Sequence, residues 1–209
     1  MRLLRLNSRL DAHALSKRFA EAGRLQIEDF LEPPDAKELA ESLNGLDWRL
    51  VLNSGARHVD LTAAHLAAIG EDRLAAIREE VKKQAAHGFQ YLYENWPVTD
   101  IAEAGGLDHR MLKAVYQTMN GEAVRGFLEK VTGEATDFCD MQATRYSAGH
   151  FLTAHTDDAP YKNRKLAYVL GLTDGWSPVW GGQLQFLDGR GGVTRSFAPR
   201  FNALSVFKV

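Results

Sequence analysis

Apolar residues recur at three- and four-residue steps through the first two thirds of the chain, and this spacing is the period of an amphipathic helix. The clearest case begins at Leu74 and reaches Phe89, with charged residues between the apolar positions. Further helices are predicted at 11–22, 35–43, 111–119 and 124–131, and short strands at 24–30 and 48–52. Asp108 suits the N-cap of the helix at 111–119, and Gly133 suits the C-cap of the next helix.

The period changes from Thr136 onward. Cys139, Met141 and Ala143 alternate with polar residues, which is the pattern of a half-buried strand. Further strands are predicted at 166–172, 183–187 and 201–209, with turns at the glycines between them. Short strands joined by glycine turns are typical of a sandwich or jelly roll, and helices that precede a sheet argue against a doubly wound fold.

These patterns together predict an α+β fold with a sandwich or jelly-roll core and N-terminal helices packed on the sheet. Residues 1–209 are expected to form a single domain, with a helix-rich part at 1–135 and the jelly-roll core at 136–209. The last apolar strand reaches Val209 without a turn or a cap after it. The core is therefore expected to lack its C-terminal strands, because an apolar strand that ends in this way leaves an exposed edge.

Composition narrows the function classes. The 209 residues are 45% hydrophobic, which is enough for a packed core and excludes a disordered chain. A net charge of −2 gives no general attraction for nucleic acid or for an anionic membrane surface. No apolar run approaches the roughly 18 residues of a membrane span. With Cys139 as the only cysteine and no signal peptide at the start, we expect a cytoplasmic protein.

Candidate chemistry begins with His155-Thr156-Asp157. If this triplet lies on a strand, His155 and Asp157 point to the same side and can bind one metal ion. Such a triplet is a weak signal by itself, since the chain has seven histidines and also contains His58-Val59-Asp60. An exposed histidine beside a solvated carboxylate is the plainer interpretation of either triplet.

The residues around His155 distinguish the two triplets. Arg145-Tyr146 and Gly149 precede His155, and the predicted strand at 166–172 and the turn Gly181-Gly182 follow it. This order and spacing resemble the 2-oxoglutarate- and iron(II)-dependent dioxygenases, and are most similar to their prolyl-4-hydroxylase-like branch. The resemblance covers about residues 138–209, and it depends on the combination of motifs and not on any one of them.

The resemblance implies an oxygenase domain whose jelly-roll core is a double-stranded β-helix, and in which His155 and Asp157 are two ligands of iron(II). Two histidines and one carboxylate form the facial triad of non-haem iron enzymes, which leaves positions open for 2-oxoglutarate and O2. The third ligand, a histidine, is expected after Val209, and a basic residue that pairs with 2-oxoglutarate is expected further on. His150 is the nearest spare histidine, but the family pattern places it in the loop before the ligand strand.

The resemblance also assigns weaker roles. Tyr146, Val169 and Leu184 match positions that contact 2-oxoglutarate, although each would be equally natural in a plain core. Gly171 stands where some relatives carry a tyrosine or an asparagine, so one hydrogen bond to the cosubstrate is in doubt. Arg164 and Tyr93 are candidates for contact with substrate, and their plainer interpretations are a solvated arginine and a core aromatic residue.

The sequence therefore predicts an enzyme, a hydroxylase of prolyl or another protein side chain or of a small molecule. Such an enzyme would couple oxidative decarboxylation of 2-oxoglutarate to succinate with hydroxylation of its substrate. One alternative is a non-catalytic jelly-roll module that binds a peptide or a small ligand. Another is a structural site for zinc or manganese, because the ligand types do not exclude those metals.

Overall fold

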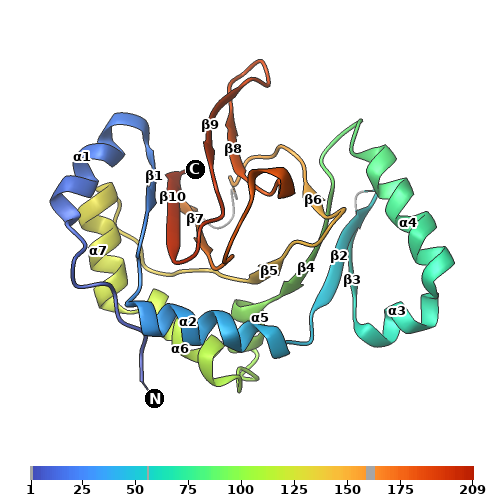
Figure 1. The fold of residues 1–209 in the computed structure, drawn as a ribbon, viewed down its shortest axis with the longest axis horizontal. Helices are drawn as coiled ribbons and strands as arrows, with labels where there is room; N and C mark the ends of the chain where they lie inside the picture. The colour runs from blue at the N-terminus through green and yellow to red at the C-terminus, as the bar shows by residue number, and fades with distance from the viewer. Residues whose placement is uncertain (1, 56, 159–162) are drawn as a thin grey trace. The chain divides into compact units, whose positions relative to one another are not determined.

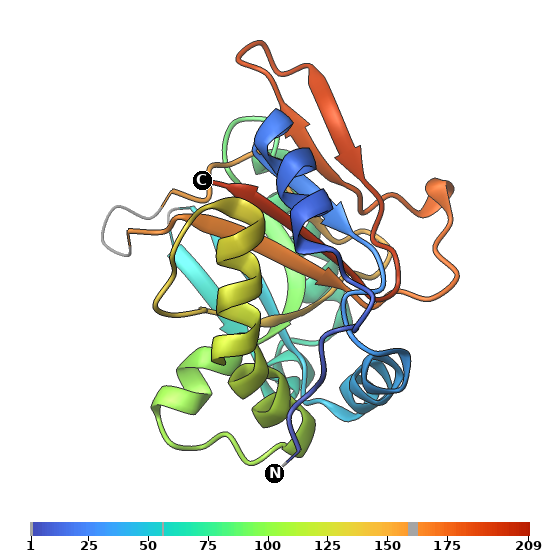
Figure 2. The ribbon, with the colours of Figure 1, turned by 90° about the vertical axis from the view of Figure 1, so that its left-hand side faces the viewer.

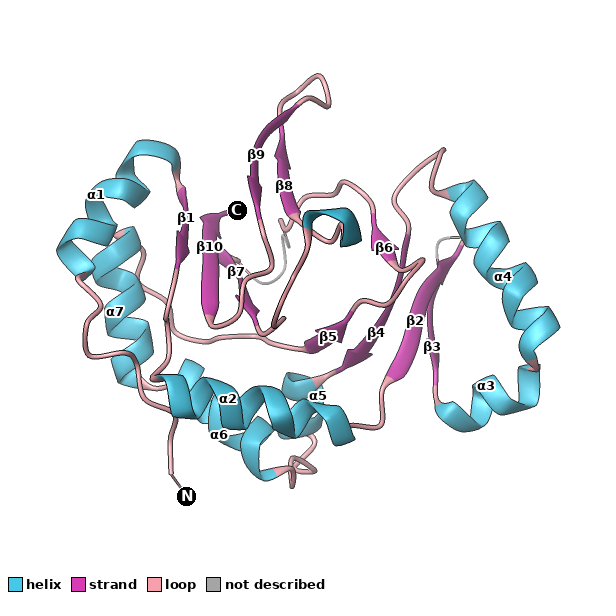
Figure 3. Cartoon of the chain, viewed as in Figure 1, coloured by secondary structure: helices cyan, strands magenta, loops and turns pink. Residues whose placement is uncertain are grey.

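The computed structural model describes residues 2–55, 57–158 and 163–209 (Figure 1). Its helices are α1 (Ala12–Ala22), α2 (Pro33–Ser42), α3 (Ala63–Ile69), α4 (Glu71–Gln84), α5 (Val98–Glu103), α6 (Arg110–Met119) and α7 (Glu122–Thr132). Its strands are β1 (Arg24–Ile27), β2 (Arg49–Ser54), β3 (Arg57–Leu61), β4 (Tyr91–Trp96), β5 (Ala143–Arg145), β6 (Phe151–Leu152), β7 (Leu166–Gly171), β8 (Leu184–Leu187), β9 (Val193–Phe197) and β10 (Ala203–Lys208). Figure 3 separates the helices from the strands by colour.

Contacts along the backbone divide the chain into two compact units. The first unit contains Met1–Asn44, Ile101–Asp140 and Thr156–Val209, and the second contains Gly45–Asp100 and Met141–His155. Each unit has its own sheet and its own helices, so each is described by itself.

The first unit is built on an antiparallel sheet with the strand order β1-β10-β7. Val206 of the central strand pairs with Leu25 on one side and with Tyr168 on the other. Leu204 and Val206, two residues apart on β10, point to the same face of the sheet and are fully buried. Seen from the side of α1 and α7, these two helices lie in front of the sheet (Figure 2). Strands β8 and β9 form a separate hairpin in this unit.

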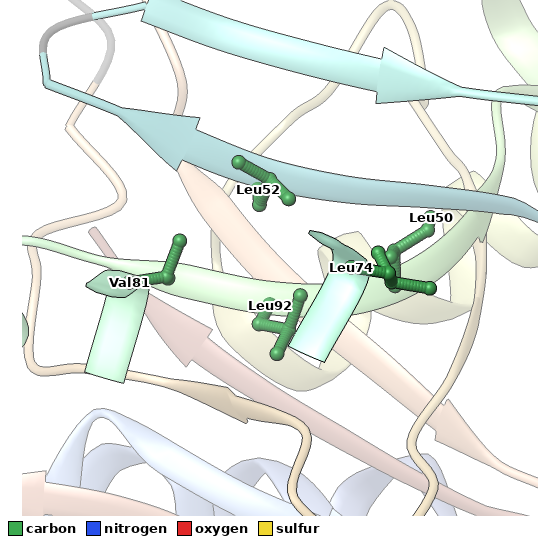
Figure 4. Packing of buried hydrophobic residues seen from close by; sticks show 5 residues of the cluster. All are labelled: Leu50, Leu52, Leu74, Val81 and Leu92. Carbon is green, nitrogen blue, oxygen red and sulfur yellow. The ribbon is translucent and has the colours of Figure 1, made fainter. Parts of the chain in front are cut away.

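The second unit is built on the order β3-β2-β4-β5, and β6 also pairs with β4. Alternate residues of β2 and β4 point to the same face, where α4 packs against them. Figure 4 shows the resulting cluster of buried side chains, which is made of Leu50, Leu52, Leu74, Val81 and Leu92.

Most predicted elements are present, and three details of the prediction were wrong. The alternating segment from Cys139 forms a strand only at β5, and residues 139–142 lie in irregular structure. The helix predicted at 74–89 ends at Gln84, because aromatic residues that alternate with other side chains begin strand β4 soon afterwards. The N-cap of α6 is His109 and not Asp108. The His109 side chain accepts a hydrogen bond from the backbone N–H of Leu112 at 3.3 Å. The backbone N–H of Asp108 donates to the carbonyl oxygen of Gly106, in the turn before the helix. The C-cap at Gly133 is confirmed, with a left-handed φ of 75°.

The α+β class is confirmed at the level of mixed helices and antiparallel sheets. Strands β1 to β4 come from the part expected to be rich in helix, so the sheets β1-β10-β7 and β3-β2-β4-β5 each combine strands from the two predicted parts of the chain. The jelly roll and the single domain remain predictions. Among the described residues, no helix combines the length and the apolar character that crossing a membrane requires.

Candidate functional site

The residues before His155 hold its imidazole ring by a defined hydrogen bond. Nδ1 of His155 lies 2.9 Å from the carbonyl oxygen of Thr153. Thr153 is itself fixed, because its backbone N–H donates to Gln90 O at 3.0 Å and its hydroxyl accepts from Gln90 N–H at 2.9 Å. A carbonyl can only accept, so Nδ1 carries the proton and the neutral ring has its lone pair on Nε2. This is the tautomer of a histidine that binds a metal through Nε2.

His150 has the opposite arrangement. Its Nδ1 accepts a hydrogen bond from the backbone N–H of Ser147 at 3.1 Å, so in the neutral ring the proton lies on Nε2. Burial lowers the pKa of His150, which favours the neutral form. Of the two histidines in this segment, therefore, His155 has the tautomer that a metal requires at Nε2.

The geometric argument from a strand was wrong. Strand β6 ends at Leu152, the chain bends at Ala154, and His155, Thr156 and Asp157 lie in irregular structure. A side chain that bonds to a backbone carbonyl two residues earlier competes with the strand ladder, and His155 does so with Thr153. His155 also belongs to the second unit and Asp157 to the first. The period of two therefore gives no shared face here.

A row of aromatic rings extends from His155 along one face of β4. We call Phe89, Tyr91, Tyr93 and Tyr146 the aromatic row. The ring centroids are 5.4 Å apart for His155 and Phe89, 5.6 Å for Phe89 and Tyr91, 5.6 Å for Tyr91 and Tyr93, and 5.2 Å for Tyr93 and Tyr146. Three members are two residues apart in sequence, which places them on the same side of an extended chain. The row brings Tyr93 and Tyr146, two predicted site residues, into contact.

Tyr93 and Tyr146 stack with an interplanar angle of 20°. Desolvation and the neighbouring Tyr93 raise the pKa of Tyr146 above the usual tyrosine range, although the side chain is still half-exposed. The Tyr146 hydroxyl is therefore protonated at neutral pH and can donate a hydrogen bond to an anionic group.

The second His-x-Asp triplet has partners within its own sheet. Nδ1 of His58 lies 2.5 Å from the hydroxyl of Tyr91, and Asp60 pairs with Arg49 at 3.2 Å. These contacts join β3 to β4 and β2.

Arg164 contacts the predicted ligand Asp157. Its Nη1 donates to the backbone oxygen of Asp157 at 3.1 Å, and the same nitrogen lies 3.7 Å from Asp157 Oδ1. The sequence predicted a substrate contact for Arg164. In the structure, the Arg164 guanidinium contacts Asp157, which lies in the same unit.

Comparison with known proteins adds independent information. Residues 141–209 match the family model described as the 2OG-Fe(II) oxygenase superfamily. This segment is therefore similar to that superfamily, over the part of the chain that carries the predicted motifs. The chain is also similar to a protein named prolyl 3-hydroxylase sudestada1 from Drosophila melanogaster, with 29% identity over 134 residues. The match covers 56% of this chain and 23% of that relative, so the chain spans about a quarter of the relative's length. The predicted family, with its prolyl hydroxylase-like character, is confirmed.

The superfamily implies iron(II), 2-oxoglutarate and O2, and the donors of this chain can be tested against that set. The Nε2 lone pair of His155 and the carboxylate of Asp157 are ligand types that iron(II) uses. Within 2–55, 57–158 and 163–209, no cluster of three or more histidine, cysteine or acidic side chains could hold a metal. By residue type, His155 and Asp157 correspond to two of the three expected oxygenase ligands, and their joint binding of a metal remains a prediction, as does the distal histidine.

Val169 and Leu184, the predicted wall residues of the oxygenase pocket, line the same small cavity in the first unit. Its volume is about 40 Å³, little more than the share of liquid volume of one water molecule. This cavity by itself is too small for 2-oxoglutarate. At Gly171, which also lines it, an added Cβ would lie 2.3 Å from the carbonyl oxygen of Arg200. A tyrosine or an asparagine therefore cannot occupy this position without a backbone shift.

Sequence reasoning missed the residues that hold His155. Thr153 and Gln90 fix the backbone, and Phe89 packs on the imidazole ring. The alternation of Phe89, Tyr91 and Tyr93 was an available signal, because a period of two indicates a strand with one aromatic face. No sequence signal identified Thr153, since its role depends on a contact with a residue 63 positions away.

Proposed function

We propose that this protein is an iron(II)- and 2-oxoglutarate-dependent hydroxylase, and that its substrate is a prolyl or another protein side chain. The observation that carries the proposal is the hydrogen bond from His155 Nδ1 to Thr153 O, within a segment that matches the oxygenase superfamily. This bond prepares Nε2 for a metal at the position where the family motif has a ligand. We further propose that the protein forms one cytoplasmic oxygenase domain over 1–209.

His155 and Asp157 would hold the iron, together with a distal histidine. When bound, iron(II) with 2-oxoglutarate supplies the oxidising power by which O2 hydroxylates a carbon atom, while 2-oxoglutarate is decarboxylated to succinate. The protein contributes placement of the reactants and exclusion of water.

Other residues have separate tasks in this proposal. The protonated hydroxyl of Tyr146 would donate to 2-oxoglutarate, and Tyr93, stacked on Tyr146, would limit the orientations of that ring. Val169 and Leu184 would form an apolar wall beside the cosubstrate. Tyr93 remains the proposed contact of the aromatic row with substrate.

A prolyl substrate is supported by the name of the similar Drosophila protein. A proline ring is apolar and flat enough to pack on tyrosine, and the half-exposed Phe89 and Tyr146 offer such surfaces. The position of the new hydroxyl group on the ring is to be measured.

The proposal is tested by incubating the protein with iron(II), 2-oxoglutarate and proline-containing peptides in air. We expect release of succinate and a gain of one oxygen atom in a peptide by mass spectrometry. The variant His155→Ala should lose both signals, whereas His13→Ala, which removes an exposed imidazole of α1, should keep them.

Two outcomes would contradict the hydroxylase. A folded protein that binds peptide but never releases succinate would be the non-catalytic binding module. Zinc retained after purification, with no turnover after iron is supplied, would indicate a structural metal site.

A further inference from the structure

The guanidinium of Arg164 lies between two carboxylates of the first unit. Its Nη1 is 3.7 Å from Asp157 Oδ1, and its Nη2 is 3.8 Å from Asp140 Oδ2. The three side chains are only 31%, 32% and 34% exposed in the order Arg164, Asp157 and Asp140. Their attraction is therefore less screened than that of a fully exposed surface pair.

Arg164 holds the backbone of Asp157 more tightly than its carboxylate. The distance of 3.1 Å from Nη1 to the backbone oxygen is that of a hydrogen bond, whereas 3.7 Å to Oδ1 is too long for one. A short bidentate pair would place both carboxylate oxygens on the arginine and would compete with a cation. The observed arrangement instead fixes the chain at Asp157 and places a positive charge beside the acid group.

Asp140, the second carboxylate beside Arg164, follows a residue that is hydrogen-bonded to the end of helix α6. The side chain of Asn120, at the C-cap of α6, accepts from Cys139 N–H at 2.8 Å and donates to Cys139 O at 3.1 Å. Cys139 Sγ also lies 3.0 Å from the hydroxyl of Tyr168 on β7. Asp140 follows directly, so the carboxylate that Arg164 meets stands on a segment with little freedom to move.

From this geometry we propose that Arg164 is a positioning residue, which holds Asp157 in place as a metal ligand by joining it to Asp140. The inference rests on the proposed function, because it takes Asp157 as a ligand. It replaces the predicted substrate contact of Arg164 with a role inside the protein. Groups that orient metal ligands through hydrogen bonds typically change metal affinity by about 10- to 100-fold when they are removed.

The test measures the affinity of the protein for Mn(II) in the presence of 2-oxoglutarate, by the EPR signal of the free ion. We expect Arg164→Gln to weaken binding by about 10- to 100-fold. Arg164→Lys keeps the charge but loses the planar guanidinium, so its affinity for Mn(II) should lie between those of the wild type and Arg164→Gln. The control is Arg190→Gln, an exposed arginine in the β8–β9 turn, which should bind as the wild type does.

A second variant tests the bridge from its other end. Asp140→Asn should also weaken Mn(II) binding, and the double variant with Arg164→Gln should be no weaker than Arg164→Gln alone, because both changes break one connection. If Arg164→Gln fails to fold by circular dichroism, Asp140→Asn and Arg164→Lys carry the test.

The outcomes separate the two proposals. Wild-type binding together with unchanged binding by Arg164→Gln and Asp140→Asn would overturn the role of Arg164 and leave the hydroxylase standing. Absence of Mn(II) and iron(II) binding by the folded wild-type protein would overturn the metal site itself, and the inference about Arg164 with it.

Discussion

One hydrogen bond distinguishes two histidines that lie five residues apart. His155 donates from Nδ1 to a carbonyl, whereas His150 accepts at Nδ1 from a backbone N–H. The first arrangement presents a lone pair at Nε2 and the second presents a proton there. Residue type alone gives both histidines the same chemistry, so the difference comes from the backbone groups that each ring meets.

Cys139 offers a prediction at the residue scale. Burial, with the charge of Asp140 added, raises the pKa of the Cys139 thiol to about 11. Only the thiolate reacts with disulfide reagents, so at pH 8 we expect labelling of the native protein to be at least about 100-fold slower than labelling of the protein in guanidinium chloride. The rate should still rise with pH above 9. Rapid labelling that levels off near pH 8.5 would contradict the raised pKa.

Asp35 offers a second prediction. Its side chain is 1% exposed, and it accepts hydrogen bonds from the Arg5 backbone N–H at 2.8 Å and from Arg5 Nε at 3.0 Å. Burial by itself would raise the pKa of Asp35, but the hydrogen bonds from Arg5 and the charges of Arg2 and Arg5 outweigh burial and lower it. We expect Asp35→Asn to lower the free energy of unfolding at pH 7 by about 2 kcal/mol, since it removes the charged acceptor of the hydrogen bonds from Arg5.

The pH dependence of that loss has a definite sign. Because the pKa of Asp35 is lower in the folded protein, its stabilisation is complete above the unfolded-state pKa of about 4 and is lost as the pH falls through the folded-state value. Denaturant unfolding of the wild type and of Asp35→Asn should therefore converge in acid. The control Glu28→Gln removes an exposed pair with Arg200 and should change stability by less than about 0.5 kcal/mol. A constant difference between wild type and Asp35→Asn from pH 7 to pH 3 would contradict the account.

At the scale of elements, the hydrophobic period was sufficient for most helices and strands. It failed between Gln84 and Tyr91, where apolar residues continue at helical steps although the chain has already turned toward β4. The residues from Tyr91 form strand β4 because they pair with β2 on one side and with β5 and β6 on the other. These partners lie far away in sequence. Likewise, strand β6 is followed by a local bond between the His155 side chain and the Thr153 carbonyl oxygen, which the period of two does not register.

Strands β7 and β10 give a prediction at this scale. Gly171 pairs with Ala203, and an added Cβ at Gly171 would meet the carbonyl oxygen of Arg200 at 2.3 Å. We expect Gly171→Ala to destabilise the protein by about 1–3 kcal/mol, because the backbone of one strand must shift.

Gly126→Ala is the matched control, since Gly126 lies inside α7 with open space around it. Alanine favours a helix there, so thermal unfolding should show a gain of about 0.5–1 kcal/mol. Equal stability of the two variants would show that the close approach at Gly171 is absent.

At the scale of the whole molecule, motifs in the C-terminal part of the sequence predicted the family. The family model matches that part of the chain, residues 141–209. The α+β class could be predicted because helices and strands have different periods. The mixed origin of the sheets could not, since pairings such as Leu25 with Val206 join the two ends of the chain and leave no local pattern. Of the candidate site, the sequence identified His155 and Asp157 by type, but it assigned them to a strand that the structure does not contain.

The most direct test of the central claim, that His155 is prepared to bind iron, is an anaerobic titration of the protein with iron(II) in the presence of 2-oxoglutarate, followed by visible absorption. We predict a weak charge-transfer band that develops in the wild type, persists in His150→Ala and is lost in His155→Ala. Absence of the band in the folded wild-type protein, or its survival in His155→Ala, would contradict the account.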